Sequence, residues 1–230
     1  MSLWIAETFV SIQGEGALTG TPSLFVRTSG CNLRCIWCDT PFTSWEPEGE
    51  TRSVADILAV GEAHPHVRHA VVTGGEPMIA KGLDELVAAL KQRGYHVTIE
   101  TAATVFTPLA GVDLWSMSPK LAGSTPGSES SGWAGRHEAT RRRPDVIRAM
   151  MAAGDYQVKL VIGSDDDLAE ADELVREVGA EPGRVMLMPE GTTVAELDRG
   201  ATWLVPAAIE RGWRFCDRLH IRIFGHTRGT

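Results

Sequence analysis

The sequence predicts an α/β fold in which the strands of a largely parallel sheet alternate with helices. Short apolar runs rich in β-branched residues recur along the chain, at residues 23–27, 69–72, 96–100, 114–118, 157–162, 185–188 and 219–223. Longer stretches with the period of an amphipathic helix lie between them, at residues 53–62, 83–93, 143–153, 165–178 and 194–209. This alternation is typical of βα units around a parallel sheet. It leaves open whether the sheet closes into a barrel.

Length and composition predict one domain spanning residues 1–230. A chain of 230 residues with 43% hydrophobic content can bury one substantial core and is short for two. The net charge of −8 repels nucleic acid and anionic lipid, so we expect neither as a partner. We also expect no signal peptide and no membrane span. The crowding of three of the four cysteines suits a shared metal better than disulfides, which indicates a reducing cytoplasm.

Residue types at the ends of the helical stretches support their assignment. Thr193 followed by Glu196 has the form of a capping box, and Ser53 and Ser164 are suitable N-caps. Glycines stand where four of the helices should end, at Gly94, Gly154, Gly179 and Gly212.

Two regions are expected to be loops. Residues 122–135 are rich in Gly and Ser and show neither the helical nor the strand period, so we expect a mobile loop there. His64, His66 and His69 straddle a proline on the connection into the strand at 69–72, and we expect all three to be exposed.

The sharpest functional signal is the set Cys31, Cys35 and Cys38, three thiols in a CxxxCxxC spacing soon after the strand at 23–27. Thiolates favour iron-sulfur clusters and zinc, and a structural zinc site normally closes with four protein ligands. No fourth ligand stands nearby, because Cys216 lies far along the chain. Three cysteines would leave one iron of a 4Fe-4S cluster open to a small molecule. A zinc site remains the alternative.

This spacing in a chain of alternating βα units resembles the signature of the radical S-adenosylmethionine superfamily. The resemblance implies a 4Fe-4S cluster whose open iron binds S-adenosyl-L-methionine. It also implies an incomplete (β/α)6 partial TIM barrel with reduced helices. The cofactor carries the chemistry, so no protein general acid or base is expected.

Polar residues near the ends of later strands are candidates for binding the cofactor. Thr73-Gly74-Gly75-Glu76 resembles the superfamily's Gly-Gly-Glu motif, which is implied to bind the methionine amino group. The other candidates are Glu100, Ser116, Ser118, Lys120, Gln157 and Met188. Each one alone could equally satisfy local backbone groups. Ala102-Ala103 departs from the Asn-Gly pair that relatives often carry at this turn.

The segment Ile12-Gln13-Gly14-Glu15-Gly16 is the best indicator of the substrate. Gln13 can donate and accept hydrogen bonds, Glu15 accepts them, and the glycines allow a flat ring to lie close to the main chain. This combination suits the edge of a pterin or a guanine-like heterocycle. A plain glycine turn is the alternative, and it would leave the acid unexplained. The segment resembles the one that opens the 7-carboxy-7-deazaguanine synthases.

Three further residues complete the expected site. Arg27 has a planar fork suited to a carboxylate, although a surface ion pair is the alternative. The resemblance implies that Arg27 holds the substrate carboxylate, that Thr40 joins a Mg²⁺ ion to the substrate, and that His220 reaches the substrate. His220 could equally be a packing residue of the strand at 219–223.

The resemblance to the 7-carboxy-7-deazaguanine synthases covers residues 9–225 except 122–141. It implies ring contraction of 6-carboxy-5,6,7,8-tetrahydropterin to 7-carboxy-7-deazaguanine, a carbon-nitrogen lyase reaction that releases ammonia and serves queuosine or other 7-deazapurine pathways. It also implies a homodimer and an electron donor such as flavodoxin or ferredoxin. The alternatives are a radical S-adenosylmethionine activase acting on a protein partner and a zinc-binding module without catalysis.

Overall fold

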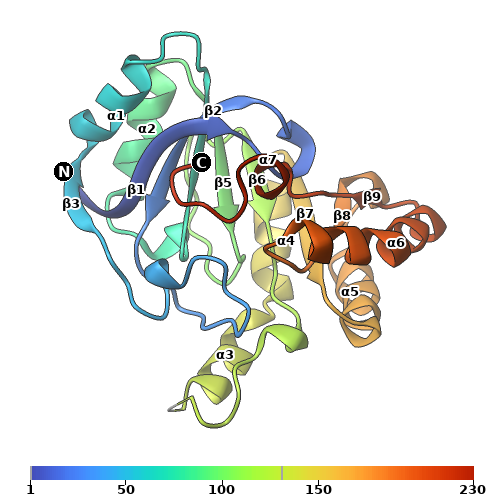
Figure 1. The fold of residues 1–230 in the computed structure, drawn as a ribbon. Coiled ribbons are helices and arrows are strands. Elements are labelled where there is room, and N and C mark those ends of the chain that lie inside the picture. Colours follow the sequence, from blue (N-terminus) through green and yellow to red (C-terminus); the bar gives the residue numbers. More distant parts are fainter. Residues whose placement is uncertain (1, 131) are drawn as a thin grey trace.

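The computed structural model describes residues 2–130 and 132–230, and the strands in those ranges form one sheet (Figure 1). The strand order is β3-β1-β2-β4-β5-β6-β7-β8-β9. The strands are β1 (Ser2–Ile12), β2 (Pro22–Thr28), β3 (Glu50–Ser53), β4 (His69–Gly74), β5 (His96–Thr101), β6 (Leu114–Met117), β7 (Tyr156–Ile162), β8 (Val185–Pro189) and β9 (Arg214–Phe215). Within the described ranges the outermost strands, β3 and β9, do not pair with each other, so the sheet is open.

The sheet is parallel except at one edge. Strands β2 and β4 to β9 run parallel, whereas β1 pairs antiparallel with both β2 and β3. The predicted α/β fold with a barrel that does not close is confirmed, and six of the seven predicted strands are present. Strands β1, β3 and β9 lie outside the predicted set.

The five predicted helices are present, and the described residues form two further helices, α3 and α7. The helices are α1 (Val54–Glu62), α2 (Leu83–Gln92), α3 (Trp133–Arg141), α4 (Pro144–Ala153), α5 (Asp165–Val178), α6 (Val194–Arg211) and α7 (Leu219–Phe224). Ser53 and Thr193 form capping boxes, and Ser164 accepts a backbone N–H at the start of α5, as predicted. Residues 102–113, between β5 and β6, form no helix, in keeping with the reduced helices expected. Across the described residues, no helix combines the length and apolar character needed to cross a membrane.

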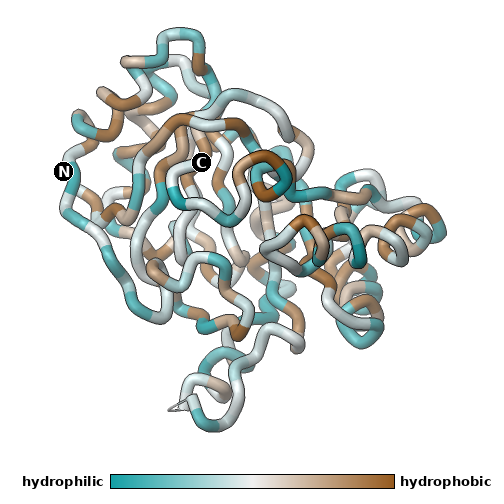
Figure 2. The backbone as a smooth tube through the Cα atoms, viewed as in Figure 1, coloured by the Kyte–Doolittle hydropathy of each residue, from teal (hydrophilic) through white to brown (hydrophobic). Residues whose placement is uncertain are grey.

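The parallel strands are buried on both faces, which explains why they read as continuous apolar runs in the sequence. The adjacent residues Val71 and Val72 point to opposite faces of the sheet, and neither has exposed surface. The hydropathy of the chain in Figure 2 shows apolar segments gathered along the strands, with polar residues concentrated in the connections. Because parallel strands all end at the same edge of the sheet, the polar side chains near their carboxyl ends lie close together at that edge.

The predicted strand at 219–223 is wrong, because these residues belong to helix α7. The alternation of apolar residues that suggested a strand is not matched by burial, since Ile221 is 1% exposed and Ile223 is 54% exposed. The backbone N–H of Leu219 donates to the carbonyl of Gly14 at 2.9 Å. This contact fixes the start of the helix on the N-terminal turn.

The predicted mobile loop at 122–135 is wrong in part. A 3-10 turn occupies Ala122–Ser124, and helix α3 begins at Trp133. Ser131 lies outside the described residues. In Figure 1, α3 projects from the edge of the fold below the sheet. Helix α3 has few apolar residues to form a buried face. Its contacts with the cysteine loop, described below, hold it in place.

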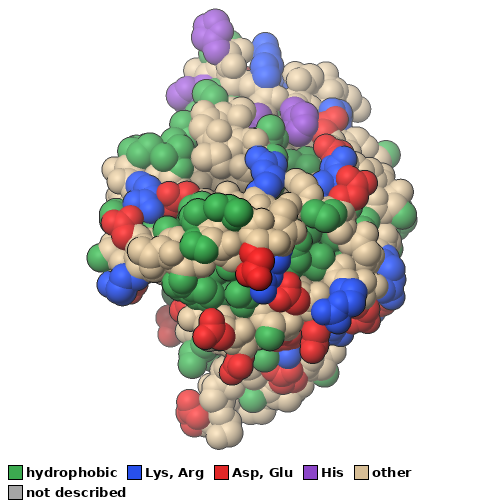
Figure 3. Space-filling view, turned by 90° about the vertical axis from the view of Figure 1, so that its right-hand side faces the viewer, with side chains coloured by type: hydrophobic (Ala, Val, Ile, Leu, Met, Phe, Trp, Pro, Cys, Tyr) green, Lys and Arg blue, Asp and Glu red, His purple; other side chains and the backbone are tan. Residues whose placement is uncertain are grey.

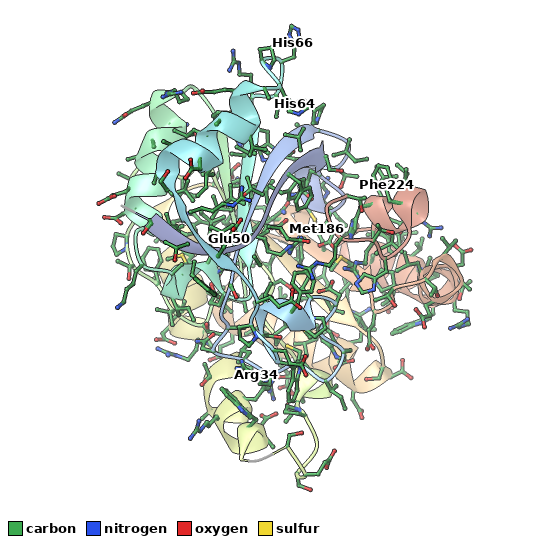
Figure 4. All side chains as sticks on the ribbon, turned by 60° about the vertical axis from the view of Figure 1, so that its left-hand side comes forward. Arg34, Glu50, His64, His66, Met186 and Phe224 are labelled. Atoms are coloured by element: carbon green, nitrogen blue, oxygen red, sulfur yellow. The ribbon has the colours of Figure 1, made fainter. Side chains whose placement is uncertain are left out.

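The prediction of three exposed histidines is confirmed for His64 and His66 and wrong for His69. Figure 4 shows His64 and His66 at the outer end of the connection that precedes β4. His69 is 4% exposed, and its ring nitrogens lie 2.7 Å from Ser23 Oγ and 2.8 Å from Thr98 Oγ1. Because the Ser23 hydroxyl donates to a backbone carbonyl, it accepts from Nδ1–H of His69, and Nε2 accepts from Thr98.

Candidate active site

A cavity of about 1130 Å³ opens at the carboxyl ends of the parallel strands. It exceeds the roughly 1,000 Å³ at the upper end of typical ligand pockets, so it can hold a nucleoside cofactor and a substrate together. Most of the predicted site residues line it, namely Ile12, Gln13, Gly14, Glu15, Arg27, Cys31, Cys35, Cys38, Thr40, Thr73, Gly74, Gly75, Glu100, Ser116, Ser118, Lys120, Met188 and His220. Gly16, Glu76 and Gln157 are outside its lining.

The three predicted cluster ligands stand on one loop that follows β2. Cys35 is buried, Cys31 and Cys38 are partly buried, and all three pack with Leu33 and Ala102. Burial raises the pKa of Cys31 to about 12 and that of Cys35 to about 11. These thiols ionise only where a cation compensates the buried charge, as iron does in a cluster.

The structure does not support a zinc site with four protein ligands. Among the residues described, no three His, Cys, Asp or Glu side chains lie close enough to hold one metal ion. Cys216 packs against Met186 and Met188 and accepts the backbone N–H of Gly16 at 3.0 Å. In a 4Fe-4S cluster each cysteine binds a different iron, so its ligands stand farther apart than those of a single ion. The cysteine loop therefore fits a cluster, and Cys216 is not part of it.

Gly74, the last residue of β4, and Gly75, which follows it, let the chain pass directly against the cysteine loop. A Cβ atom on Gly75 would lie 2.3 Å from the carbonyl oxygen of Gly30 and 2.7 Å from Cβ of Cys31. A Cβ atom on Gly74 would lie 2.3 Å from the carbonyl oxygen of Thr28. Backbone atoms cannot move aside as a flexible side chain can, so glycine is required for this close approach.

Glu76 forms hydrogen bonds that connect the turn after β4 with the end of β5. Its carboxylate accepts from Thr101 Oγ1 at 2.7 Å, from the amide of Ala102 at 2.9 Å and from the amide of Met78 at 3.0 Å. Burial raises the pKa of Glu76 despite these three donors. Glu76 thereby ties the turn after β4 to the end of β5. Its role in binding the methionine amino group stays a prediction.

The polar residues of β6, of the turn after it and of the start of β7 form two hydrogen-bonded pairs. Lys120 Nζ donates to Ser118 Oγ at 2.8 Å, which holds the ammonium group at the cavity wall. Gln157 Nε2 donates to Ser116 Oγ at 2.8 Å, and its Oε1 accepts the amide of Ala17 at the same distance. Gln157 thus joins β6 and β7 to the N-terminal turn from behind the cavity.

A buried ion-pair network surrounds Glu15. Its two oxygens accept from Lys159 Nζ at 2.8 Å and from Arg218 Nε at 3.0 Å. Burial raises the pKa of Glu15, but Lys159 and Arg218 outweigh it and hold the pKa well below its usual value. Gln13 Nε2 donates to Glu100 Oε1 at 3.0 Å, and that oxygen lies 3.4 Å from Lys159 Nζ. The network presents Glu15 as an ionised acceptor with the amide of Gln13 fixed beside it.

Arg27 points into the cavity from β2. Its Nε donates to Glu7 at 2.9 Å, and Glu7 also accepts from Arg228 at 3.0 Å. The ion pair that stood as the alternative for Arg27 is therefore present, but the Arg27 side chain is only 19% exposed. In the described part of the chain, neither Nη nitrogen of Arg27 donates to another residue.

Asp39 and Thr40 follow the cysteine loop and line the cavity. Asp39 pairs with Arg218, which outweighs the effect of burial and lowers the pKa of Asp39. Thr43 Oγ1 donates to the carbonyl of Thr40 at 2.9 Å. The Thr40 hydroxyl lies 3.4 Å from Thr43 Oγ1 and 3.9 Å from Cys38 Sγ.

His220 reaches the cavity from α7. A Cβ atom on Gly14 would lie 2.0 Å from Nδ1 of His220, so the absence of a side chain at Gly14 makes room for the imidazole. Burial lowers the pKa of His220 even though Glu15 opposes it, so burial favours the neutral ring.

Comparisons with known proteins decide the family. Residues 25–121 match the family model described as the Radical SAM superfamily. A 7-carboxy-7-deazaguanine synthase of Rhodopirellula baltica is 51% identical over 231 residues, which cover 100% of this chain and 89% of that protein. The chain belongs to the 7-carboxy-7-deazaguanine synthase family. The family member of Halobacterium salinarum is 45% identical and is matched over 100% of this chain and 93% of its own length. The crystal structure of QueE from Escherichia coli superimposes with a TM-score of 0.67 and 25% identity, covering 96% of this chain and 95% of that chain.

Membership in the 7-carboxy-7-deazaguanine synthase family confirms that the chain is an enzyme with a fold of the radical S-adenosylmethionine type. The family implies a 4Fe-4S cluster and S-adenosyl-L-methionine as cofactors, and the cysteine loop, the Gly74-Gly75 approach and the size of the cavity fit both groups.

Sequence reasoning missed Arg218, although this residue joins three parts of the site. Its side chain donates to Glu15 and Asp39 and to the carbonyl of Gly191 at 2.7 Å. No local pattern marks Arg218. The available signal was indirect: two carboxylates placed in a binding site need a buried cation, and the sequence does not say which one supplies it.

Proposed function

We propose that the chain converts 6-carboxy-5,6,7,8-tetrahydropterin to 7-carboxy-7-deazaguanine with loss of ammonia, for queuosine or other 7-deazapurine biosynthesis. The observation that carries this proposal is that one cavity holds both the three-cysteine loop and the polar edge of Gln13 and Glu15. When bound, the cluster and S-adenosyl-L-methionine supply the one-electron chemistry that removes a hydrogen atom from the substrate. The residues of the chain hold the ring, orient it and shield it from water.

In this proposal, Gln13, Glu15 and His220 bind the edge of the pterin ring. Glu15 is ionised by its two cationic neighbours, and each of its oxygens retains a lone pair for an N–H group of the ring. Gln13 uses one amide hydrogen on Glu100 and keeps the other for the ligand. Gly14 makes room for the His220 imidazole beside the ring, and Ile12 supplies an apolar contact. Gly16 acts from behind the wall, where a Cβ atom would lie 2.3 Å from Nε2 of Gln157.

Arg27 anchors the substrate carboxylate in this proposal. Glu7 holds its Nε, which fixes the plane of the guanidinium group, and the two Nη nitrogens can then form paired bonds to a carboxylate. Thr40 contributes an oxygen ligand to a Mg²⁺ ion that also contacts the substrate. Mg²⁺ keeps most of its waters and needs few protein ligands, so Thr40 and the substrate are enough to hold it.

The cofactor occupies the other part of the cavity in this proposal. Cys31, Cys35 and Cys38 bind the cluster. The residues assigned to S-adenosyl-L-methionine are Thr73, Gly74, Gly75, Glu76, Glu100, Ser116, Ser118, Lys120, Gln157 and Met188. Glu76 and Gln157 act from behind the wall, through the hydrogen bonds described above.

We also propose that residues 1–230 work as a single domain, in a homodimer, in the cytoplasm, with a protein such as flavodoxin or ferredoxin as electron donor. The cytoplasm suits the four cysteines, which are free thiols. Apolar side chains lie between charged ones on the face drawn in Figure 3. Val205 and Ile209 of α6 are 36% and 74% exposed, and they offer apolar area for a subunit contact.

Anaerobic product analysis tests the proposed function. Reconstituted protein is given 6-carboxy-5,6,7,8-tetrahydropterin, S-adenosyl-L-methionine and a reductant, and wild type is compared with Arg27→Ala and with Arg93→Ala, an exposed arginine on the surface. We expect 7-carboxy-7-deazaguanine from wild type and from Arg93→Ala. Loss of a paired contact to a charged group should lower kcat/KM of Arg27→Ala about 10²-fold. Undiminished turnover by Arg27→Ala would refute the anchoring role, and absence of the product from wild type would refute the function.

A further inference from the structure

Residues 122–141 hold the cysteine loop from outside the matched superfamily region, which ends at residue 121. Three N–H groups of the cysteine loop donate hydrogen bonds to residues of this segment. The amide of Arg34 donates to His137 Nδ1 at 3.2 Å, the amide of Ile36 donates to the carbonyl of Ser124 at 2.9 Å, and Trp37 Nε1 donates to the carbonyl of Gly123 at 3.2 Å. In Figure 4, Arg34 lies directly beside α3.

The hydrogen bonds define how His137 is oriented. Ser124 Oγ donates its only hydrogen to the carbonyl of Leu121 at 2.6 Å, so it accepts from Nε2–H of His137 at 2.9 Å. Nδ1 is then the unprotonated nitrogen, and it accepts the amide of Arg34. His137 has no exposed surface, so water cannot replace it as the acceptor.

The result is that the backbone of Cys35 is fixed on both sides. The residue before it donates to His137, the residue after it donates to Ser124, and its own carbonyl accepts from Trp45 Nε1 at 2.9 Å. The Arg34 side chain adds a second tie to α3, because its guanidinium carbon lies 4.0 Å from the centre of the Trp133 ring.

We propose that His137 is a positioning residue for the cluster, and that the segment 122–141 holds Cys35 in place for iron binding through the amide of Arg34. The inference rests on the proposed function only in requiring a cluster on the cysteine loop. Residues that orient the ligands of a metal centre affect its retention and its reduction potential without touching the metal.

Two nearly isosteric variants test His137. His137→Leu removes the acceptor, whereas His137→Asn loses the same ring but places a carbonyl oxygen where Nδ1 stood. The control is His66→Leu on an exposed loop far from the cysteines. The readouts are the rate of iron release to a chelator, the electron paramagnetic resonance spectrum of the reduced cluster, and its midpoint potential.

We expect His137→Leu to release iron about ten-fold faster than wild type, since a buried N–H is left without its acceptor, and to show an altered spectrum. His137→Asn and His66→Leu should stay close to wild type. Equal release rates and identical spectra for the Leu and Asn variants would overturn the proposal. If neither variant folds, hydrogen exchange of the wild-type holoprotein tests the proposal instead. The Arg34 amide should be protected as strongly as the amides of α3. Rapid exchange of the Arg34 amide would overturn the proposal.

These readouts need no pterin. A wild-type protein that holds its cluster and makes no 7-carboxy-7-deazaguanine refutes the proposed function and leaves the comparison of His137 variants unaffected. A wild-type protein that binds no cluster refutes both.

Discussion

Replacing Arg218 by Met tests the buried network directly, because Met keeps the apolar volume and removes the charge. Arg218 is 9% exposed, and its two carboxylate partners differ in exposure: Glu15 is 14% exposed and Asp39 is 39% exposed. Breaking a buried ion pair by removing one partner costs about 3–5 kcal/mol. Glu15 keeps Lys159 as a partner, and water reaches Asp39, so the cost belongs at the low end of that range.

We therefore expect Arg218→Met to lower the free energy of unfolding by about 3 kcal/mol, and the melting temperature by about 6–12 °C for a chain of this size. Denaturant unfolding of the protein measures the first quantity and calorimetry the second. The control is Arg222→Met, whose ion pairs with Asp198 and Asp217 are more exposed and should be worth less than about 1 kcal/mol.

A double-mutant cycle with Glu15→Gln separates the ion pair from general packing. The two substitutions remove the same interaction, so their combined effect should fall short of the sum by about 1–3 kcal/mol. Simple additivity, or an Arg218→Met protein as stable as wild type, would refute the assignment of Arg218 as the counter-ion of Glu15.

Three further outcomes follow from the structure. Burial lowers the pKa of His69 to about 4, so wild type should lose up to about 3 kcal/mol as the pH falls from about 6.5 to 4, where unfolded His69 binds a proton that the folded form excludes. His69→Gln should flatten this pH dependence in denaturant unfolding, and an unchanged slope would contradict it. Gly75→Ala should hold much less iron per chain than Gly183→Ala after reconstitution, because only at Gly75 would a Cβ atom meet the cysteine loop; equal iron contents would count against the close approach. Ala103 has a φ of 54°, a conformation that glycine adopts without strain. The unfolding free energy of Ala103→Gly should therefore exceed that of Ala102→Gly by about 1 kcal/mol. The reverse order would contradict this.

The sequence was sufficient for features that depend on local pattern. The strands of the parallel core are continuous apolar runs because they are buried on both faces, and the caps at Ser53 and Thr193 act within a single turn. The CxxxCxxC spacing identifies a metal site because three thiols within eight residues share one loop whatever the rest of the fold does.

Features that depend on distant contacts were not predictable in the same way. Helix α7 has strand-like alternation, but its start is fixed by a hydrogen bond to Gly14 some two hundred residues earlier. Helix α3 has little apolar character, and its position depends on the cysteine loop through His137. Arg218 joins the site only because folding brings Glu15 and Asp39 to it.

The central claim is that Cys31, Cys35 and Cys38 hold a cluster with one open iron for S-adenosyl-L-methionine. The most direct measurement is electron paramagnetic resonance of the anaerobically reconstituted, reduced protein before and after S-adenosyl-L-methionine is added. We predict the spectrum of a reduced 4Fe-4S cluster that changes on addition, because the ligand binds the iron itself. A spectrum that does not change, or a purified protein that retains zinc and gives no cluster signal, would contradict the account.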